Sequence, residues 1–470
     1  MNKSVLGKIT SIIFLVTYAI FFVFINNYNI LPIKYRILIL FILFIPVLGN
    51  LILCFLGKKF LIGKILLFII LFLLSLGEVL FISYAHKSIS TVEEISNSKY
   101  QIKNEVSFLV LKDSPIKSIE EIDGKNIITA ETIDSKSTTK ALESLDSTNL
   151  EPIDYTDYVT GAKGLLNGEA DLMLLNESFR PMVEENIEGF SEKTRVLKSV
   201  LIDEKKEKQE KKQVKEDESF NVFISGIDTY GALSNVSRSD VNMIVSVNPR
   251  KGKILITSIP RDTYLKIGDM GYDKLTHAGL FGVDTSIKSI ENFFDIDIDY
   301  FGKVNFTSLK ELVDILGGIT VENPVEFTTS GGAYHFPQGE IYMDGDMALS
   351  FARERYHLEE GDFDRGRNHT RIMTGIIKKL LSPEMLLNFN TLAEIALKSV
   401  NTNMSYDKMI ELVNKQIEKG QNWDIESQSL EGYGSMGEES LLMPNAQLYM
   451  MIPSEDSVKE VRENIIENNK

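Results

Sequence analysis

Arginine is concentrated in one short stretch of a chain that is otherwise strongly acidic. Five arginines fall within 19 residues, although the 470-residue chain carries a formal net charge of −16. A guanidinium binds phosphate oxygens through its planar fork and keeps its charge when partly desolvated, so clustered arginines suit a pyrophosphate better than lysines would. A polyanionic ligand is therefore expected near Arg353, Arg355, Arg365, Arg367 and Arg371.

Charged side chains also stand at the ends of three expected strands. Strand ends of α/β sheets are where ligands usually lie. Asp228 and Asp240 would add hard oxygen ligands for a Mg²⁺ or Mn²⁺ ion that bridges a bound pyrophosphate. Taken singly, each arginine is more often part of a surface salt bridge; the combination with these aspartates favours a site. The charged groups at the strand ends are Asp228, Arg238, Asp240, Arg261 and Asp262.

The elements that must position these groups follow an α/β pattern after Ser219. Runs rich in β-branched and aromatic residues predict strands, and periodic apolar positions predict helices between them. The strands are expected at 220–227, 241–247 and 253–259, and the helices at 285–294, 308–316 and 370–381.

Three apolar stretches open the chain, each near the ~20 residues that cross a bilayer as a helix. They cover about 9–25, 37–56 and 60–82. A cleaved signal peptide is disfavoured, because no small-residue cleavage site follows the first stretch and two further apolar runs do. The distribution of lysine and arginine slightly favours a cytoplasmic N-terminus, so three spans would place everything after about residue 85 outside the cell.

A small α/β domain is expected between the membrane region and the charged strand ends. The run from Ser118 to Ile128 and the run from Gly161 to Leu172 resemble half of an extracellular solute-binding protein. This domain would either bind a small ligand or partner beside the main site or serve as a spacer from the bilayer, and the spacer is favoured. From Asp203 to Glu218, 13 of 16 residues are charged, which predicts a linker or a solvated helix.

Several other classes of protein are disfavoured. The net charge opposes general binding to nucleic acid. The single cysteine, Cys54, excludes an intrachain disulfide, and the five histidines show no HExxH spacing. The run Gly432–Gly437 fits GxGxxG, but it lacks a strand-then-helix context and is expected to be a loop. His277 is expected to lie with Lys274 near the site.

The motifs around the charged residues are similar to those of one family. They are Arg238-Ser239-Asp240, Ile259-Pro260-Arg261-Asp262, the run Lys274–Gly279, the run Leu316–Val321 and the run Arg353–Asn368. Over about residues 220–450 the chain resembles the LytR-CpsA-Psr family of cell-wall ligases. The resemblance implies a domain that binds a polyprenyl-pyrophosphate lipid with arginines and Mg²⁺ and passes a glycopolymer to a hydroxyl of peptidoglycan.

The resemblance also implies roles for individual residues. Asp228 and Asp240 would hold the metal, and Asp240 is in addition a candidate base, although a metal-bound carboxylate is a poor one. The family commonly has two glutamines where this chain has His369 and Thr370, and a histidine could still donate to a phosphate in a pH-dependent way. The catalytic set is Asp240, Arg238, Arg261, Asp262, Arg353 and Arg355, and the pyrophosphate set is Arg238, Arg261, Lys274, Arg353, Arg355, Arg365, Arg367 and His369.

The expected fold class is α/β: a mixed sheet with helices on both sides, preceded by the small α/β domain and an all-α transmembrane region. A teichoic-acid-like or capsule-like polymer, peptidoglycan and membrane lipid are the expected partners, at the outer face of a Gram-positive-type cell membrane. A polyprenyl-pyrophosphate hydrolase and a non-enzymatic membrane sensor remain alternatives. The expected boundaries are 1–85, 90–202, 203–218, 219–450 and a C-terminal tail at 451–470.

Overall fold

The computed structural model describes most of the chain and divides it into two compact units. The first unit comprises residues 1–97, 378–398 and 404–422, and the second comprises 98–377, 399–403 and 423–470. Asp228 and most of the charged segment 203–218 lie outside the described residues. The described residues are 3–29, 31–55, 61–98, 101–145, 149–205, 217–227, 236–330, 332–359, 361–387 and 400–470.

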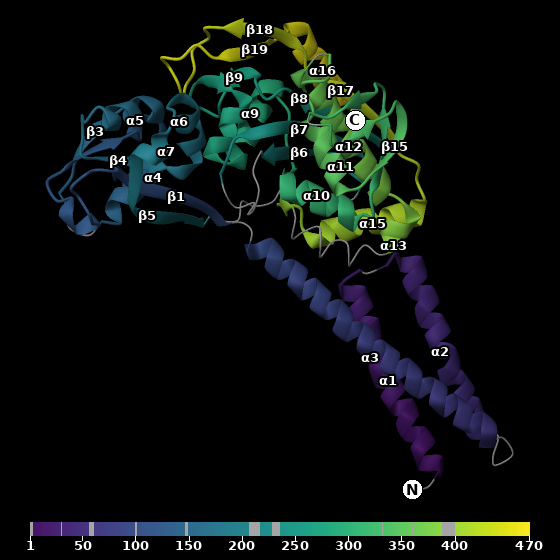
Figure 1. The fold of residues 1–470 in the computed structure, drawn as a ribbon. Coiled ribbons are helices and arrows are strands. Elements are labelled where there is room, and N and C mark those ends of the chain that lie inside the picture. Colours follow the sequence, from purple (N-terminus) through teal and green to yellow (C-terminus); the bar gives the residue numbers. More distant parts are fainter. Residues whose placement is uncertain are drawn as a thin grey trace. The chain divides into compact units, whose positions relative to one another are not determined.

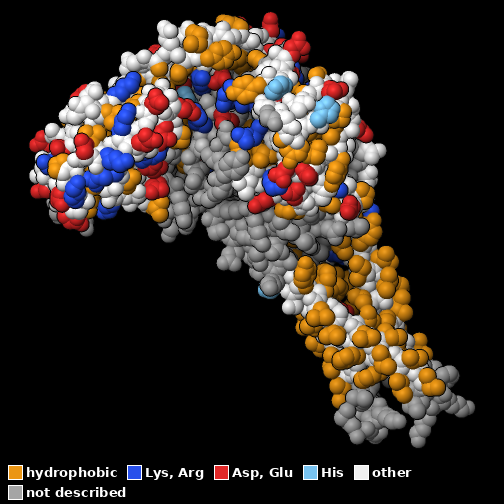
Figure 2. Space-filling view, viewed as in Figure 1, with side chains coloured by type: hydrophobic (Ala, Val, Ile, Leu, Met, Phe, Trp, Pro, Cys, Tyr) orange, Lys and Arg blue, Asp and Glu red, His pale blue; other side chains and the backbone are white. Residues whose placement is uncertain are grey.

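The first unit is built on three N-terminal helices, α1 (Lys3–Asn27), α2 (Ile33–Phe55) and α3 (Leu61–Ser98). Hydrophobic side chains predominate on the described part of these helices that faces the viewer in Figure 2, and Phe41 and Ile62 are 64% and 76% exposed. Segments Ile9–Asn27 and Ile62–His86 are long and apolar enough to cross a membrane. The three expected apolar stretches are therefore helical, and two of them meet the requirements for a span within the described residues.

A helix from late in the chain joins these N-terminal helices. Helix α15 (Tyr406–Lys419) begins at a serine cap, since the Ser405 hydroxyl accepts from the Lys408 amide. Tyr406 and Ile410 are buried in one cluster with α1 side chains such as Phe21 and Phe24. Short helix α13 (Pro383–Leu387) belongs to the same unit. Residues 404–422, which we expected inside the larger α/β domain, therefore pack with the apolar helices instead.

The second unit starts with a five-stranded domain of order β3-β2-β4-β1-β5 (Figure 1). Phe108 and Leu109 of β1 are both fully buried but belong to different clusters, because successive side chains of a strand point to opposite faces. The sheet is thus covered on both sides. Its elements are β1 (Gln101–Leu111), β2 (Asn126–Thr129), α4 (Glu131–Glu143), β3 (Glu151–Asp154), α5 (Tyr158–Leu166), β4 (Leu172–Asn176), α6 (Arg180–Asn186), α7 (Phe190–Lys193) and β5 (Thr194–Lys205), with 3₁₀ turns η2 (Ile119–Glu121) and η3 (Glu177–Phe179).

The larger α/β domain contains a six-stranded mixed sheet of order β16-β11-β6-β7-β8-β17. Strand β11 runs parallel to β6 and β17 runs parallel to β8, whereas β7 is antiparallel to both of its neighbours, β6 and β8. A register shift between Gly226 and Ile227 of β6 lies opposite the start of β7. The strands are β6 (Phe220–Ile227), β7 (Ser239–Asn248), β8 (Lys253–Ile259), β11 (Tyr300–Asn305), β16 (Asn401–Thr402) and β17 (Asp424–Ser429).

Helices cover both faces of this sheet. Ile244 and Leu255 face a core that includes Ile290 of α9 and Ile465 of α16. On the other face, Gly366 of α12 lies so close to the sheet that an added Cβ would be 3.2 Å from the Ser258 hydroxyl. The helices are α8 (Leu275–Ala278), α9 (Val283–Phe294), α10 (Phe306–Ile315), α11 (Gly345–Arg353), α12 (Asp362–Leu380) and α16 (Glu455–Asn469), with the 3₁₀ turn η4 (Gly279–Phe281).

Short strand pairs complete the domain. The pair β18–β19 and the C-terminal residues differ from what we expected. The GxGxxG run forms β18 (Gly432–Met436), which pairs with β19 (Tyr449–Pro453), so it is a hairpin strand and not a loop. Residues 451–470 are not a tail: they complete β19 and form α16, whose Val461 is buried in the core. The remaining strands are β9 (Tyr264–Lys266), β10 (Tyr272–Lys274), β12 (Ile319–Asn323), β13 (Phe327–Thr328), β14 (His335–Phe336) and β15 (Gly339–Met343).

Candidate active site

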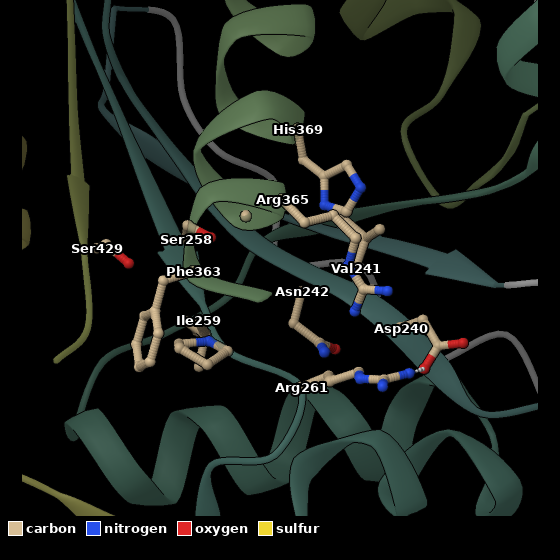
Figure 3. Close-up of a pocket in the computed structure, with 12 residues that line it drawn as sticks. Asp240, Val241, Asn242, Ser258, Ile259, Arg261, Phe363, Arg365, His369 and Ser429 are labelled. Atoms are coloured by element: carbon tan, nitrogen blue, oxygen red, sulfur yellow. Dashed lines mark hydrogen bonds and ion pairs between the residues drawn. The ribbon is translucent and has the colours of Figure 1, made fainter. Parts of the chain in front are cut away.

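A pocket opens where β7 begins, β8 ends and α12 crosses the sheet (Figure 3). Strands β7 and β8 are antiparallel, so the start of one lies beside the end of the other, and Asn242 is paired with Ile259. This register brings together charged groups that are about 20 residues apart in the sequence. The pocket is lined by Asp240, Val241, Asn242, Ser258, Ile259, Pro260, Arg261, Phe363, Arg365, Gly366, His369 and Ser429.

Asp240 and Arg261 form an ion pair at the centre of the pocket. The Arg261 Nη1 donates to Asp240 Oδ1 at 3.0 Å, and the two side chains are only 25% and 12% exposed. The Thr276 hydroxyl donates to the same oxygen at 3.3 Å. Both bonds fall on Oδ1, so Oδ2 is the oxygen of Asp240 that a cation or a substrate hydroxyl could use. Thr276 was not expected from the sequence, although it lies within the Lys274–Gly279 motif.

A second layer of ion pairs supports Arg261. Asp262 Oδ2 lies 3.8 Å from Arg261 Nε, and Asp262 Oδ1 accepts from Lys274 Nζ at 2.9 Å. Lys274 is thus joined to the site through Asp262, as the expected network requires. His277 lies with Lys274, since its Nδ1 is 2.8 Å from Oδ1 of the fully buried Asp273 and the Lys274 amide donates to the same oxygen at 2.7 Å.

Helix α12 contributes Arg365 and His369 from successive turns, since residues four apart share a helix face. In Figure 3 the Arg365 guanidinium points toward the Asp240–Arg261 pair. Gly366 permits this approach, because any side chain there would press against Ser258. Arg365 is therefore the arginine of the sequence cluster that shares the pocket with Asp240.

His369 has a different chemical state from the one expected. Its Nε2 lies 2.8 Å from the Ala352 carbonyl oxygen, and a ring nitrogen facing a carbonyl must donate. Burial, together with the positive charge of Arg365, lowers the pKa of His369 to about 4. The ring is therefore neutral near pH 7, and its other nitrogen is an acceptor. With Nε2 directed at the Ala352 carbonyl, donation to a phosphate would require a proton on Nδ1 as well.

Arg353 and Arg355 flank a buried carboxylate and do not line this pocket. The Arg353 guanidinium lies over the Phe306 ring at 4.7 Å, and that of Arg355 lies over the Tyr356 ring at 4.8 Å. Between them, Glu354 is 3% exposed. Burial would raise the pKa of Glu354, but hydrogen bonds from backbone amides, including that of Ser330, hold its pKa below the usual value.

Two more of the expected arginines are held by carboxylates, whereas Arg371 donates to the side-chain oxygen of Asn368 at 2.6 Å. Arg367 Nη1 bonds Asp364 Oδ1 at 2.7 Å on the same helix. Arg238 donates to both carboxylate oxygens of Glu185, at 2.8 and 2.6 Å, and Glu185 belongs to the five-stranded domain. Burial disfavours the charged guanidinium of Arg238, but Glu185 outweighs this effect and the pKa of Arg238 is raised.

Of the two expected metal ligands, Asp240 and Asp228, the structure describes only Asp240. Among the described residues, no group of three or more His, Cys, Asp and Glu side chains is arranged to hold a metal. Mg²⁺ is, however, commonly bound by one or two carboxylates together with substrate phosphates. Asp240 fits that pattern, because Oδ2 is not used by Arg261 or Thr276 and the oxygen is the hard donor that Mg²⁺ prefers. Asp228 lies outside the described residues.

The structure thus brings together four of the expected site residues, Asp240, Arg261, Arg365 and His369, in one pocket. Asp262 and Lys274 lie behind them. The sequence did not point to Asn242, Ser258, Phe363 or Ser429, which line the same pocket. These are ordinary strand and helix residues whose role depends on which elements pack together.

Comparison with known proteins assigns the chain to a family. Residues 188–466, more than half of the chain, match the model of the LytR_cpsA_psr family. The chain therefore belongs to the LytR_cpsA_psr family. A second model, described as DNA polymerase processivity factor, matches residues 58–175, which is well under half of the chain and runs from the apolar helix α3 into the five-stranded domain.

The sequence is similar to the protein named TagU in two Bacillus species. The polyisoprenyl-teichoic acid–peptidoglycan teichoic acid transferase TagU of Bacillus anthracis is 37% identical over 202 residues, which cover 43% of this chain and 65% of that protein. TagU of Bacillus subtilis (strain 168) is 34% identical over 236 residues, which cover 50% of this chain and 75% of that protein. The chain thus spans slightly less than two thirds of the first of these relatives.

Solved structures match the same part of the chain. The crystal structure of B. subtilis TagV aligns with a TM-score of 0.47 and 28% identity, over 54% of this chain and 98% of that one. The structure described as TagT bound to LIIa-WTA aligns with a TM-score of 0.45 and 27% identity, over 56% of this chain and 96% of that one.

Proposed function

We propose that this protein transfers a glycopolymer, teichoic-acid-like or capsule-like, from a polyprenyl-pyrophosphate carrier to a hydroxyl of peptidoglycan. The observation that carries the proposal is the pocket in which Asp240 and Arg261 are paired and Arg365 points toward them. Membership of the LytR_cpsA_psr family and the names of the TagU relatives support the same activity.

In this phosphoryl transfer the protein mainly positions the reactants and neutralises the charge of the phosphates. The acceptor hydroxyl attacks the phosphorus that carries the sugar, the bond to the bridging oxygen breaks, and polyprenyl phosphate leaves. Phosphoryl transfer of this kind is accelerated mainly by cations that neutralise the phosphate oxygens. Arg261 and Arg365 supply that charge, and their forks can bind two oxygens each.

Asp240 is placed to orient the acceptor side of the reaction. Its Oδ1 is fixed by Arg261 and Thr276, so the carboxylate cannot rotate freely. A Mg²⁺ or Mn²⁺ ion held by Asp240 and the pyrophosphate, with Asp228 as a second ligand, would stabilise the charge on the leaving phosphate. The acceptor proton passes to Asp240 or to water, and metal binding is the role we favour for this carboxylate.

The membrane placement belongs to the same proposal. The apolar helices α1, α2 and α3 anchor the chain in the cell membrane as three spans, with the N-terminus in the cytoplasm. The described portions of α1 and α3 are long enough to do so, and all three helices expose large hydrophobic side chains, which predominate in the view of Figure 2. Three spans put the pocket on the outer face, where peptidoglycan is assembled in a Gram-positive-type bacterium.

The proposal is tested with the full-length protein in detergent. A labelled polyprenyl-pyrophosphoryl oligosaccharide and peptidoglycan fragments are mixed with the enzyme, with Mg²⁺ or EDTA. Asp240→Asn and Arg365→Gln are expected to lower the transfer rate by roughly 100- to 1,000-fold, the usual effect of removing one group that stabilises the transition state. Arg250→Gln is the control, because Arg250 lies in the turn after the other end of β7.

Each outcome separates the proposal from its rivals. Transfer that is lost in both variants and retained in the control supports the transferase. Release of the free phosphorylated oligosaccharide without transfer would make the protein a hydrolase. Binding of the lipid with no turnover would contradict the proposal and favour a sensor.

A further inference from the structure

An ion pair between Glu185 and Arg238 connects the five-stranded domain to the candidate active site. Helix α6 places Glu185 against Arg238, which lies two residues before Asp240, and the carboxylate accepts from both terminal nitrogens of the guanidinium at 2.8 and 2.6 Å. The five-stranded domain and the larger α/β domain belong to the same compact unit. This contact therefore joins a domain without expected catalytic residues to a residue of the expected phosphate set.

An apolar contact holds α6 in this place. Met182 and Val183 of α6 are buried in one cluster that also contains Leu280 and Leu442 of the larger domain. The Phe179 ring meets the Phe281 ring edge-on, with centroids 5.8 Å apart. Glu185 thus belongs to a helix that is anchored in an apolar cluster shared with the larger domain, so its position does not depend on the ion pair alone.

The backbone of Arg238 is fixed by the same segment. Gly279, directly before Leu280 and Phe281, lies so close to the chain at 237–239 that an added Cβ would be 2.6 Å from the Ser237 carbonyl oxygen. Glycine is therefore required for this approach. The main chain around Arg238 thus lies against Gly279, and the Arg238 side chain is paired with Glu185.

The geometry of the pair leaves donors for a ligand. A guanidinium has five N–H groups in a rigid fork. A carboxylate that binds both terminal nitrogens accepts one N–H from each of them. The Nε–H group and the N–H group of the adjacent terminal nitrogen then remain as a second pair of parallel donors. This second pair can still bind two oxygens of a phosphate. The carboxylate also offsets the repulsion between Arg238 and Arg261, which acts when no anion is bound.

We propose that Glu185 is a positioning residue that aims Arg238 at the pyrophosphate of the lipid carrier, so that the five-stranded domain forms part of the transfer site. This inference rests on the proposed function for the identity of the anion. On this proposal the five-stranded domain completes the site, whereas the sequence favoured the interpretation that this domain is a spacer. Glu185 itself touches no substrate, and its effect passes entirely through Arg238.

The experiment measures binding and transfer separately. Full-length wild type, Glu185→Gln and Arg238→Ala are titrated with inorganic pyrophosphate by calorimetry, and the same proteins are assayed for transfer with varied lipid substrate. Glu188→Gln is the matched control, because Glu188 carries the same charge in the same domain and the one bond seen there, to Lys193, uses its backbone carbonyl. Near-ultraviolet circular dichroism checks that each variant keeps its tertiary packing.

Glu185→Gln is expected to weaken pyrophosphate binding and raise KM by about two- to five-fold, the scale of a partly exposed ion pair. In the Arg238→Ala background it should have no further effect, because the residue acts only through the arginine. A purely structural role would not disappear in that background. Equal behaviour of Glu185→Gln and Glu188→Gln would overturn the inference, and so would tighter binding, which would make Glu185 a competitor of the anion.

The outcomes also distinguish this inference from the proposed function. If wild type binds pyrophosphate and the Glu185→Gln loss depends on Arg238, but no transfer occurs, the transferase proposal fails while the positioning role stands. If transfer occurs with equal KM in wild type and Glu185→Gln, the transferase stands and the positioning role fails. If wild type binds no pyrophosphate, both fail.

Discussion

Replacing Glu354 with alanine is expected to loosen the segment that carries Arg353 and Arg355. Glu354 Oε1 accepts from the backbone amides of Arg355, Tyr356 and His357 at 3.0, 2.8 and 3.1 Å, and Oε2 accepts from the Ser330 amide at 2.8 Å. One buried carboxylate therefore fixes three successive amides after α11. The alanine variant removes every one of these acceptors at once.

The size of the effect follows from the number of amides that lose a partner. A buried donor left without an acceptor costs about 1–3 kcal/mol. Ser330, Tyr356 and His357 are exposed, so water can replace the carboxylate there, whereas Arg355 is only partly exposed. The local stability of the segment should therefore fall by about 1–3 kcal/mol, the cost of one such donor. Since each ~1.4 kcal/mol is a factor of ten, the amides should exchange roughly 5- to 150-fold faster.

Hydrogen exchange of the amides of Arg355, Tyr356 and His357 measures this directly, and the transfer assay is run on the same variants. Glu354→Gln keeps one carbonyl oxygen but turns an NH₂ group toward a backbone donor, so an intermediate loss is expected. Glu359→Gln, which removes an exposed charge from the same loop, is the control. Unchanged exchange in Glu354→Ala would refute the view that this carboxylate holds the arginine segment.

Three further predictions concern other groups. The pKa of His369 is lowered to about 4 from 6.5, so between these pH values the unfolded chain binds a proton at His369 that the folded chain lacks. The contribution of His369 to stability is therefore complete above about pH 6.5 and is lost as the pH falls toward 4. Thermal unfolding of His369→Gln should be less sensitive to acid than that of wild type, and equal sensitivity would contradict the lowered pKa. Asp273→Ala should destabilise the fold by about 3–5 kcal/mol, since the buried carboxylate accepts from the Ser440 hydroxyl and the Leu442 amide as well as from His277; a melting temperature equal to that of wild type would argue against this. In the presence of inorganic pyrophosphate, Asp240→Asn should weaken Mn²⁺ binding measured by electron paramagnetic resonance, and an unchanged affinity would remove Asp240 from the metal site.

Much of the main sheet was predictable because local pattern and tertiary environment agree there. Strands 220–227 and 253–259 have the predicted bounds, and β7 exceeds the prediction by three residues. These strands are buried, so runs of β-branched and aromatic residues mark them clearly. The predicted helices 308–316 and 370–381 began too late, because α10 starts at Phe306 behind an asparagine cap and α12 starts with a polar, arginine-rich turn.

The C-terminal part was predicted less well. Residues 455–469 are mostly polar, and the few apolar positions such as Val461 and Ile465 did not suggest a core helix. The Gly432–Met436 strand was missed because glycine is a poor strand former and its partner lies 13 or more residues later. In both cases the contact that stabilises the element comes from a distant part of the chain.

The sequence by itself determined the chemical character of the site. Arginines at strand ends and on α12, with aspartates beside them, predict a site for a phosphate-rich anion, and the identity of these residues does not depend on how the domains pack. The sequence also determined the apolar N-terminal helices, since length and hydrophobicity alone decide whether a helix can cross a bilayer.

Only the tertiary structure decided which of these groups act together. Glu185 and Arg238 are 53 residues apart, and nothing in either local pattern marks them as partners. The neutral state of His369 follows from its bond to Ala352, a carbonyl 17 residues away, and from its burial beside Arg365. Charge and residue type are properties of the chain, whereas pairing and protonation depend on distances that packing alone sets.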